Sequence, residues 1–482
     1  MNRRMVLNIL GRMLIAEAAL LALPMAVSVY YLEKCFFAFL ITALFSLFTG
    51  LLLWLVSKPR KTTIYAKEGF IIVALVWIVM SLVGALPFTI SREIPNYFDA
   101  VFETVSGFTT TGASIVRDVE KLSRGILFWR SFTHWIGGMG ILLFVMAIIP
   151  NLSDRTVHIM RAEVPGPVVD KIVPRLKQTA KILYSIYIVI TAIEVVLLLC
   201  GGMTFYESLL HSFGTAGTGG FGIKRESIAY YSPYCQWVIG IFMLIFGVNF
   251  NIYYLIIAKR IKGVLKSKEL LWYLSIFFIS FVLISFNVSF LYNNFSETVR
   301  NSFFQVSSIM TTTGYSTVDF DKWPLFSRGL LLVIMMIGGC SGSTAGGLKV
   351  SRVALLIKQV GREIKHMLHP KSVSVVRFDS KPVDEDTLKN VSVYFILYII
   401  CIMAVFMLLC LEPPPFNTET NLSATLACIN NIGPGLDIVG PAGNYAAYSS
   451  FSKVVLSVAM LLGRLEIFPL LLLFTPAMWK KH

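Results

Sequence analysis

Charged residues are scarce in this sequence, and their scarcity excludes the commonest class of protein. Asp, Glu, Lys and Arg make up 14% of the 482 residues, whereas 56% are hydrophobic. Soluble globular domains carry about 25% charged residues, and a mean hydropathy of +0.72 is too apolar for one. Long apolar runs with few charges instead match bilayer-spanning helices of about twenty residues.

Cysteine is present, but never in the spacing that metal or disulfide chemistry requires. The seven cysteines are scattered along the chain, and no two of them form a CxxC pair. Neither a disulfide framework nor a zinc site is therefore indicated. We interpret these cysteines as small apolar fillers of a packed interior.

Enzyme motifs are also missing. No HExxH sequence, pair of catalytic carboxylates or nucleophile motif occurs in any apolar span. The nearest candidate is a glycine-rich stretch before Lys349, but a phosphate-binding loop needs Gly before this lysine and Ser or Thr after it. Leu348 and Val350 occupy those positions. We therefore expect neither an enzyme nor a chain that binds a cofactor.

Acidic residues are outnumbered by basic ones, 27 against 42, which gives a formal net charge of +15. Nucleic acid is not the expected partner, because the basic residues lie in loops between apolar spans, as at 57–68 and 259–268. Cytoplasmic loops of membrane proteins carry this excess. We expect a multi-pass protein in a lipid bilayer with both termini in the cytoplasm. The first apolar run continues to about Tyr31, so it predicts a retained helix rather than a signal peptide.

The sequence does contain a short motif of small residues and glycine that occurs four times. Thr109–Ser114 and Thr311–Thr317 are near duplicates, Thr215–Gly222 is a looser copy, and Asn430–Gly435 is the most divergent. The copies lie about a hundred residues apart, each after an apolar span and a short apolar segment and before another span. Repetition at a regular interval indicates a repeated architecture.

The main chain explains this motif better than the side chains do. A short extended segment points successive carbonyl groups one way, and glycine permits backbone geometry that a β-carbon forbids. Rings of such carbonyls replace the hydration shell of a potassium ion, and four copies are needed because one strand cannot surround an ion. Aligned on glycine, the candidate filter residues are Thr110, Thr111, Gly112, Ala113, Thr218, Gly219, Gly220, Phe221, Thr312, Thr313, Gly314, Tyr315, Asn431, Ile432, Gly433 and Pro434.

The second copy leaves two registers open, because either Gly219 or Gly220 can be the aligned glycine. We choose Gly220, since it is followed by an aromatic residue, as is Gly314. The fourth copy departs further, because Ile432 offers no hydroxyl group and Pro434 has no N–H to donate. We therefore expect a ring that is less regular than one made of four identical chains.

The whole pattern predicts an all-α polytopic membrane protein made of four parallel M1-P-M2 repeats, in which P is a re-entrant half-helix. The short segments cannot cross a bilayer, and non-helical backbone at that depth must line a cavity or be buried in protein. Parallel repeats are related by an axis along the membrane normal, which here gives a pseudo-fourfold pore. We expect ten spans and four half-helices, divided into an N-terminal pair of helices at 1–66 and repeats at 67–165, 166–265, 266–385 and 386–482.

Glycine interrupts the second span of repeat three. Residues 338–347 contain five glycines, each costing about 1 kcal/mol relative to Ala in a helix, so this span should break beneath the filter. The other repeats have fewer glycines at this level, and we expect an expanded loop in repeat three alone. A turn for close helix packing is the alternative. The candidate gate residues are Gly338, Gly339, Ser341, Gly342, Ser343, Thr344, Gly346, Gly347 and Arg464.

Arg464 lies in the middle of the second span of repeat four, where an ionisable side chain is costly and indicates function. Pairing with Glu466 is the simplest alternative, but residues two apart do not share a helix face. We expect Arg464 to face the pore, to donate hydrogen bonds to carbonyls of the 338–347 loop, and to repel cations in the closed state.

These repeats, the glycine-rich loop in the third and the arginine in the fourth resemble the Trk/Ktr/HKT superfamily of cation transporters. With two extra N-terminal spans, the chain looks most like the membrane subunit of bacterial Trk potassium-uptake systems. The resemblance implies potassium uptake across a bacterial inner membrane, a homodimer, and a cytoplasmic TrkA-like subunit with nucleotide-binding domains that controls the gate. In relatives, glycine at all four filter positions accompanies potassium preference and serine at the first accompanies sodium; here Gly112 stands there.

A proton- or sodium-coupled carrier with alternating access is the competing interpretation. Such a carrier needs buried carboxylates on its pathway, and the acidic residues within the expected spans are few, namely Glu17, Glu194 and Glu466. The sequence therefore favours the gated pore.

Overall fold

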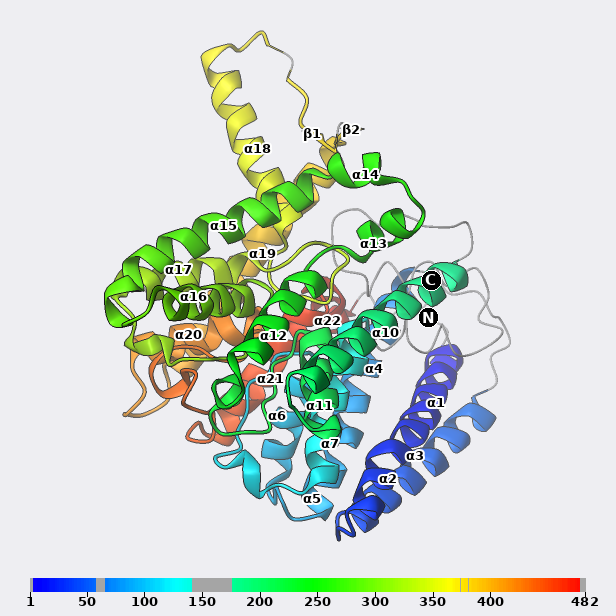
Figure 1. Cartoon of the computed structure of the whole chain (residues 1–482). Helices are drawn as coiled ribbons and strands as arrows, with labels where there is room; N and C mark the ends of the chain where they lie inside the picture. The colour runs from blue at the N-terminus through cyan, green and yellow to red at the C-terminus, as the bar shows by residue number, and fades with distance from the viewer. Residues whose placement is uncertain (1–2, 58–65, 141–175, 373, 380, 477–482) are drawn as a thin grey trace.

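The computed structural model describes residues 3–57, 66–140, 176–372, 374–379 and 381–476. Over these ranges the chain is helical almost throughout (Figure 1). Its only strands there form a small antiparallel hairpin, β1 (Arg377–Phe378) and β2 (Lys381–Pro382). The expected all-α class is confirmed.

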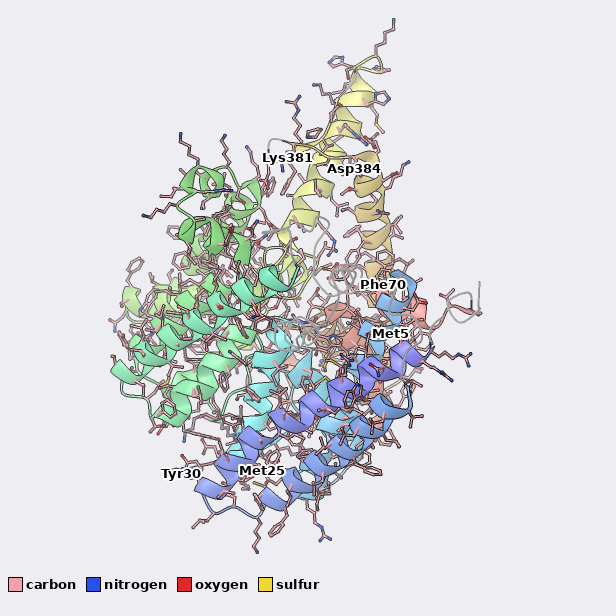
Figure 2. The ribbon with its side chains drawn as sticks, turned by 90° about the vertical axis from the view of Figure 1, so that its right-hand side faces the viewer. Met5, Met25, Tyr30, Phe70, Lys381 and Asp384 are labelled. Carbon is pink, nitrogen blue, oxygen red and sulfur yellow. The ribbon has the colours of Figure 1, made fainter. Side chains whose placement is uncertain are left out.

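The first three helices form a hairpin on one face of the molecule (Figure 2). They are α1 (Arg3–Leu20), α2 (Ala22–Tyr30) and α3 (Phe36–Val56). The first span, expected from the sequence at about 7–31, lies within Arg3–Tyr30, which is long and apolar enough to cross a membrane as one span. Its helix has a one-residue turn at Leu21, near Pro24, which has no N–H to donate to the carbonyl four residues before it. α1 and α3 cross closely where Gly11 meets Gly50: a β-carbon on Gly11 would lie 2.7 Å from the Gly50 carbonyl oxygen. Small residues permit this approach between membrane helices.

Beyond the hairpin, one order of elements occurs four times, starting each time with a long apolar helix. These long helices are α4 (Ala66–Gly84) with its continuation α5 (Leu86–Ile90), α10 (Leu176–Cys200), α15 (Lys268–Val288) and α19 (Glu385–Leu409). A short helix follows each of them: α6 (Tyr97–Phe108), α11 (Phe205–Gly217), α16 (Phe295–Met310) and α20 (Thr418–Ile429). Asn96, Thr204 and Asn417 begin three of the short helices, each accepting a backbone N–H of the first turn through its side-chain oxygen.

A third helix completes each unit after the glycine motif, and within the described residues those of the second, third and fourth units are broken. They are α7 (Arg124–Gly138), α12 (Pro233–Phe246) with α13 (Phe250–Ile257), α17 (Leu325–Ile337) with α18 (Val350–Leu368), and α21 (Ser450–Arg464) with α22 (Phe468–Leu473). The breaks in the second and fourth units are short, at 247–249 and 465–467, whereas the break in the third unit is a loop over 338–349, so among the described third helices only that of repeat three carries the expected expanded loop. α12 and α13 meet at 91°, because the Asn249 side chain accepts the N–H of Asn251 and starts a new helix. α21 ends where Glu466 and Ile467 take positive φ values of 56° and 64°. The remaining elements are α14 (Ile261–Leu265) and the 3₁₀ turns Val119–Lys121, Ser227–Tyr230, Ser289–Leu291, Phe320–Lys322 and Asp437–Val439.

The four units close on themselves through their third helices. α7 packs on α11, α12 on α16, α17 on α20, and α21 on α6. Each third helix therefore contacts the short helix of the following unit, and the last contacts that of the first. The chain forms a ring of units rather than a row.

Six helices of the described chain are long and apolar enough to cross a membrane, and α12 with α13 adds a seventh if the bent pair counts as one span. The six comprise the N-terminal pair and the long first helix of every unit. The third helices of the second, third and fourth units fall short because each is broken, and α7 is described only over Arg124–Gly138. The chain is a polytopic helical membrane protein, and the total of ten spans stays a prediction.

One end of the molecule carries elements that leave the helical bundle. α18 projects there, with the β1–β2 hairpin and α14 beside its base (Figure 1). Lys381 and Asp384 lie at this end, away from Tyr30 at the tip of the N-terminal hairpin (Figure 2). The two ends of the bundle therefore differ: one carries α18, α14 and the β1–β2 hairpin, and the other carries the tip of the N-terminal hairpin.

Candidate ion-conduction site

The four glycine motifs adopt one main-chain conformation. We call Thr109–Ala113, Gly217–Phe221, Thr311–Tyr315 and Asn430–Pro434 the first to fourth glycine segments. Two residues before the aligned glycine, the chain takes a left-handed φ of 55–57°, which residues with a side chain seldom adopt, at Thr110, Thr218, Thr312 and Asn431. The glycine itself has a φ between 72° and 98°, at Gly112, Gly220, Gly314 and Gly433. Gly219 lies outside this region, so Gly220 occupies the equivalent position, which is the register chosen from the sequence.

The segments meet in cyclic order around one centre. A β-carbon placed on each glycine would collide with the carbonyl oxygen that precedes the glycine of another segment. The distances are 2.0 Å from Gly112 to Gly219 O, 1.9 Å from Gly220 to Thr313 O, 2.0 Å from Gly314 to Ile432 O, and 2.7 Å from Gly433 to Thr111 O. All four glycines line one cavity of about 190 Å³. Segments a hundred residues apart therefore form a closed ring of main chain.

Side chains hold the ring from behind. In the first segment Thr109 and Thr111 share a hydrogen bond between their hydroxyl oxygens of 2.8 Å, and Thr311 and Thr313 do the same in the third at 2.8 Å. Thr109 also donates to the Val105 carbonyl of α6 at 2.6 Å. These hydroxyl groups are hydrogen-bonded to one another and to the short helices.

The fourth segment is the least regular, in the direction that its sequence predicts. Its glycine has the largest φ of the four, 98°, and the loosest contact, 2.7 Å to Thr111 O. Other hydrogen bonds replace those of the missing threonines. Tyr445 donates its hydroxyl to the Gly433 carbonyl at 2.7 Å, and Asn431 Nδ2 donates to Thr111 Oγ1 of the first segment at 3.0 Å. The ring still closes despite Ile432 and Pro434.

The glycine-rich loop at 338–349 lies directly against this ring. The Gly346 N–H donates to Thr312 Oγ1 at 2.6 Å, and a β-carbon on Gly346 would be 2.3 Å from the Asn430 carbonyl oxygen. The loop folds back on itself, because Gly338 and Gly347 both take a φ of 76° and touch each other. This segment of the third repeat therefore fills the space next to the third and fourth glycine segments.

The same loop also enters the break between α12 and α13. Cys340 N–H donates to the Gly247 carbonyl at 3.0 Å, and Phe250 N–H donates to the Gly342 carbonyl at 3.1 Å. Thr344 Oγ1 donates to the Phe246 carbonyl at 3.2 Å. The loop and the break between α12 and α13 supply hydrogen-bond partners for each other's free backbone groups, so each break stabilises the other.

Arg464 connects this loop to the first repeat. Its Nη1 donates to the Thr344 carbonyl at 2.8 Å, and its Nη2 donates to the carbonyls of Gly137 and Gly138 at 2.5 and 2.6 Å. The arginine thus makes a hydrogen bond of the kind expected from the sequence, and gains a second anchor at the end of α7. Glu466 does not take part, since its carboxylate forms an ion pair with Arg352.

Three charged groups at this site escaped the sequence reasoning. Lys349 is buried and its Nζ donates to the Ala345 carbonyl. Arg130 and Glu103 form an ion pair of 2.7 Å with side chains only 3% and 0% exposed. Glu103 accepts the Ile115 N–H at 3.0 Å, just after the first glycine segment. Arg130 and Glu103 each appear in the sequence as a lone charge in an apolar run, and they lie 27 residues apart.

The ring is not a side-chain metal centre of the usual kind in the part of the chain that the structure describes. Within the described residues, no group of three or more His, Cys, Asp and Glu side chains is placed to hold a metal ion. The cavity wall at the ring is instead built from the glycine segments. Four basic side chains, Arg117, Arg130, Lys224 and Arg225, line the same cavity.

A polytopic helical membrane protein whose four units meet in a ring of main-chain turns has an architecture suited to cation transport. A model of the TrkH family, described as cation transport protein, matches residues 35–481. The chain belongs to this family, so the expectation that it is not an enzyme is confirmed.

Individual relatives agree with this assignment over their whole lengths. The chain is 37% identical over 490 residues to the Trk system potassium uptake protein TrkH of Escherichia coli K12, covering 100% of both chains. It is 34% identical to the potassium uptake protein TrkG of the same strain, over 95% of this chain and 94% of that one. The crystal structure of the potassium transporter TrkH from Vibrio parahaemolyticus superposes with a TM-score of 0.86 at 32% identity, covering 100% of both chains.

Proposed function

We propose that this chain is the membrane subunit of a Trk-type potassium-uptake system and conducts potassium through a gated central pore. Support comes from the relatives, which are all named as potassium uptake or transport proteins. The observation that carries the proposal is the closed ring of four glycine segments. Carbonyl oxygens gathered there replace the water around a potassium ion.

The architecture follows from the repeated elements. Four M1-P-M2 repeats, at 67–165, 166–265, 266–385 and 386–482, surround a pseudo-fourfold axis, and the helices at 1–66 pack outside them. Ten spans result if each broken third helix crosses the membrane. The cyclic packing of third helices on short helices supports this arrangement. The basic loops place both termini on the cytoplasmic side of a bacterial inner membrane.

The loop at 338–349 and Arg464 form the gate of this pore. The loop lies against the ring through Gly346, so an ion leaving the ring meets it next. Arg464 fixes the loop through the Thr344 carbonyl, and its charge opposes a cation at the same level. Opening requires that the loop leave the ring and that these hydrogen bonds break.

Regulation requires a partner on the side where α18 and the β1–β2 hairpin project (Figure 1). We propose a homodimer of this chain bound to a cytoplasmic TrkA-like subunit with nucleotide-binding domains. The projecting elements offer both charge and apolar surface, since Ile364 and Met367 of α18 are 53% and 79% exposed. Such a surface is suited to a protein partner.

A coupled carrier is the second candidate, and two side chains favour it. Glu17 and Glu194 are fully buried, and neither appears in an ion pair among the described residues. Buried acids of this kind relay protons in some transporters. They lie on α1 and α10, Glu194 close to Thr215 of α11, and neither belongs to a glycine segment, which is why we prefer the pore.

Flux measurements separate the two candidates. The purified chain is reconstituted into vesicles with a potassium gradient alone, and rubidium uptake is followed. A variant with 340–346 deleted serves as the matched sample whose gate cannot close. Uptake in either sample without a proton or sodium gradient is the expected result. Uptake that appears only when a second gradient is imposed would establish the carrier instead.

A further inference from the structure

The second glycine segment lacks the side chains that support the others. Where the first segment has Thr109 and Thr111, the second has Gly217 and Gly219. Neither of these glycines has a left-handed φ, so the backbone does not require glycine at either position. Some other feature must exclude a side chain there.

That feature is His134, which belongs to α7 and therefore to the preceding repeat. A β-carbon on Gly219 would lie 2.3 Å from both Cγ and Nδ1 of the imidazole ring and 2.5 Å from Cδ2. A β-carbon on Gly217 would lie 2.2 Å from the backbone oxygen of His134. His134 is fully buried, and its ring stacks on Phe221 with centroids 4.2 Å apart and planes at 23°. One residue of α7 thus occupies the volume behind the whole second segment.

We propose that His134 is the positioning residue of the second glycine segment, with its imidazole ring in place of the paired threonines found behind the first and third. The inference rests on the proposed potassium pore and deepens it, because it names what sets the carbonyl of Gly219. That carbonyl is the one that packs against Gly112. A shift of the imidazole ring therefore moves the Gly219 carbonyl oxygen, which lies where the first and second segments meet.

The support differs in kind from that of the neighbouring segments. Thr311 and Thr313 belong to their own segment and are joined by a hydrogen bond of 2.8 Å. His134 acts by shape across the boundary between two repeats, through van der Waals contact with Gly219 and Phe221. Arg130, one helical turn earlier, adds its guanidinium carbon 3.9 Å from the centroid of the Phe221 ring. α7 therefore holds the second segment from two points on one face.

The steric numbers define a swap experiment. Gly219→Ala introduces a methyl group that collides with the imidazole ring, and His134→Ala removes that ring. The double variant should therefore restore what each single variant loses. The matched control is Gly217→Ala, whose methyl group collides with a backbone oxygen that His134→Ala leaves in place. Potassium-to-sodium permeability in reconstituted vesicles is the readout, with monodisperse elution as the measure of folding.

We expect each single variant to lower the permeability ratio by about tenfold, equivalent to about 1.4 kcal/mol. The His134→Ala, Gly219→Ala pair should recover most of this loss, and the His134→Ala, Gly217→Ala pair should not. Equal recovery at both glycines, or an unchanged ratio in every variant that folds, overturns the proposal. If the single variants fail to fold, the two double variants decide by the same comparison of ratio and folded yield.

Failure of this inference is distinguishable from failure of the pore. Gly314→Ser alters the third segment, which does not touch His134 in the contacts described above. If Gly314→Ser changes the permeability ratio while the His134 and Gly219 variants leave it unchanged, the four glycine segments still form the selective element, but His134 does not position the second one. If neither alters the ratio, the ring is not the selective element.

Discussion

The third and second glycine segments differ in sequence and agree in main chain. The third has threonine on both sides of Thr312, whereas the second has glycine on both sides of Thr218. Their φ values are nevertheless 57° and 55° at these threonines, and 84° and 72° at Gly314 and Gly220. The side chains lie behind the ring, where any group of suitable volume serves. In the proposed pore the atoms offered to an ion come from the backbone, and these are unchanged by the exchange of threonine for glycine.

The largest effect should come from the ion pair behind the first and second segments. Arg130→Gln leaves the Glu103 carboxylate buried without its partner, which costs about 3–5 kcal/mol. We expect loss of folded protein, measured as yield and thermal stability in detergent. The control is Lys121→Gln, which breaks an exposed pair with Asp118 whose lysine is 83% exposed. Exposed pairs contribute about 0–1 kcal/mol, and equal losses in the two variants would contradict the account.

Selectivity tests the third segment next. Gly314→Ser places a side chain at a φ of 84°, with its β-carbon 2.0 Å from the Ile432 carbonyl oxygen. The backbone must move, at a strain of about 1–3 kcal/mol, and we expect relative sodium permeability to rise. Gly329→Ser is the matched control, because nothing lies within 4 Å of a β-carbon there. An unchanged ratio at Gly314 would refute its assignment to the filter.

A smaller change is expected at the gate. Arg464→Ala removes the hydrogen bonds to Thr344, Gly137 and Gly138, of which only the bond to Thr344 holds the loop. The loop should leave the ring more often, so rubidium flux at rest should increase several-fold. Arg362→Ala, which removes a charge from the projecting helix α18, should leave resting flux at its normal level. Wild-type flux in the Arg464 variant would show that the loop does not close the pore.

The smallest effect should follow from making the fourth segment resemble the first and third. Ile432→Thr restores the hydroxyl group that this segment lacks, at a fully buried position. Because the carbonyl of residue 432 remains in place, we expect the potassium-to-sodium permeability ratio to change by less than about threefold. A large change would show that the side chains, and not only the main chain, set selectivity.

The fold could be predicted where local sequence decides it. Apolar runs of membrane length and four copies of a glycine motif were enough to predict an all-helical membrane protein with repeats. The aromatic residue after Gly220 also gave the register that the φ values support. These features are local, because hydropathy and the need for positive φ act within a few residues.

The missed features depend on contacts between distant parts of the chain. A single glycine such as Gly247 in an apolar helix is normally tolerated. The break after α12 is stabilised by the loop, because Cys340 N–H donates to the Gly247 carbonyl and the Gly342 carbonyl accepts Phe250 N–H. The Arg130–Glu103 pair joins a short helix to a third helix. His134 looks like an ordinary buried histidine until Gly219 is seen against its ring. No local sequence pattern predicts these contacts between distant residues.

Bound-ion crystallography tests the central claim most directly. Crystals of this chain grown with rubidium or thallium, and measured at the absorption edge of that ion, would locate it by anomalous scattering. The account predicts peaks on the axis of the ring, surrounded by the carbonyl oxygens of Thr111, Gly219, Thr313 and Ile432. Strong peaks elsewhere in the protein, with none inside the ring, would contradict it.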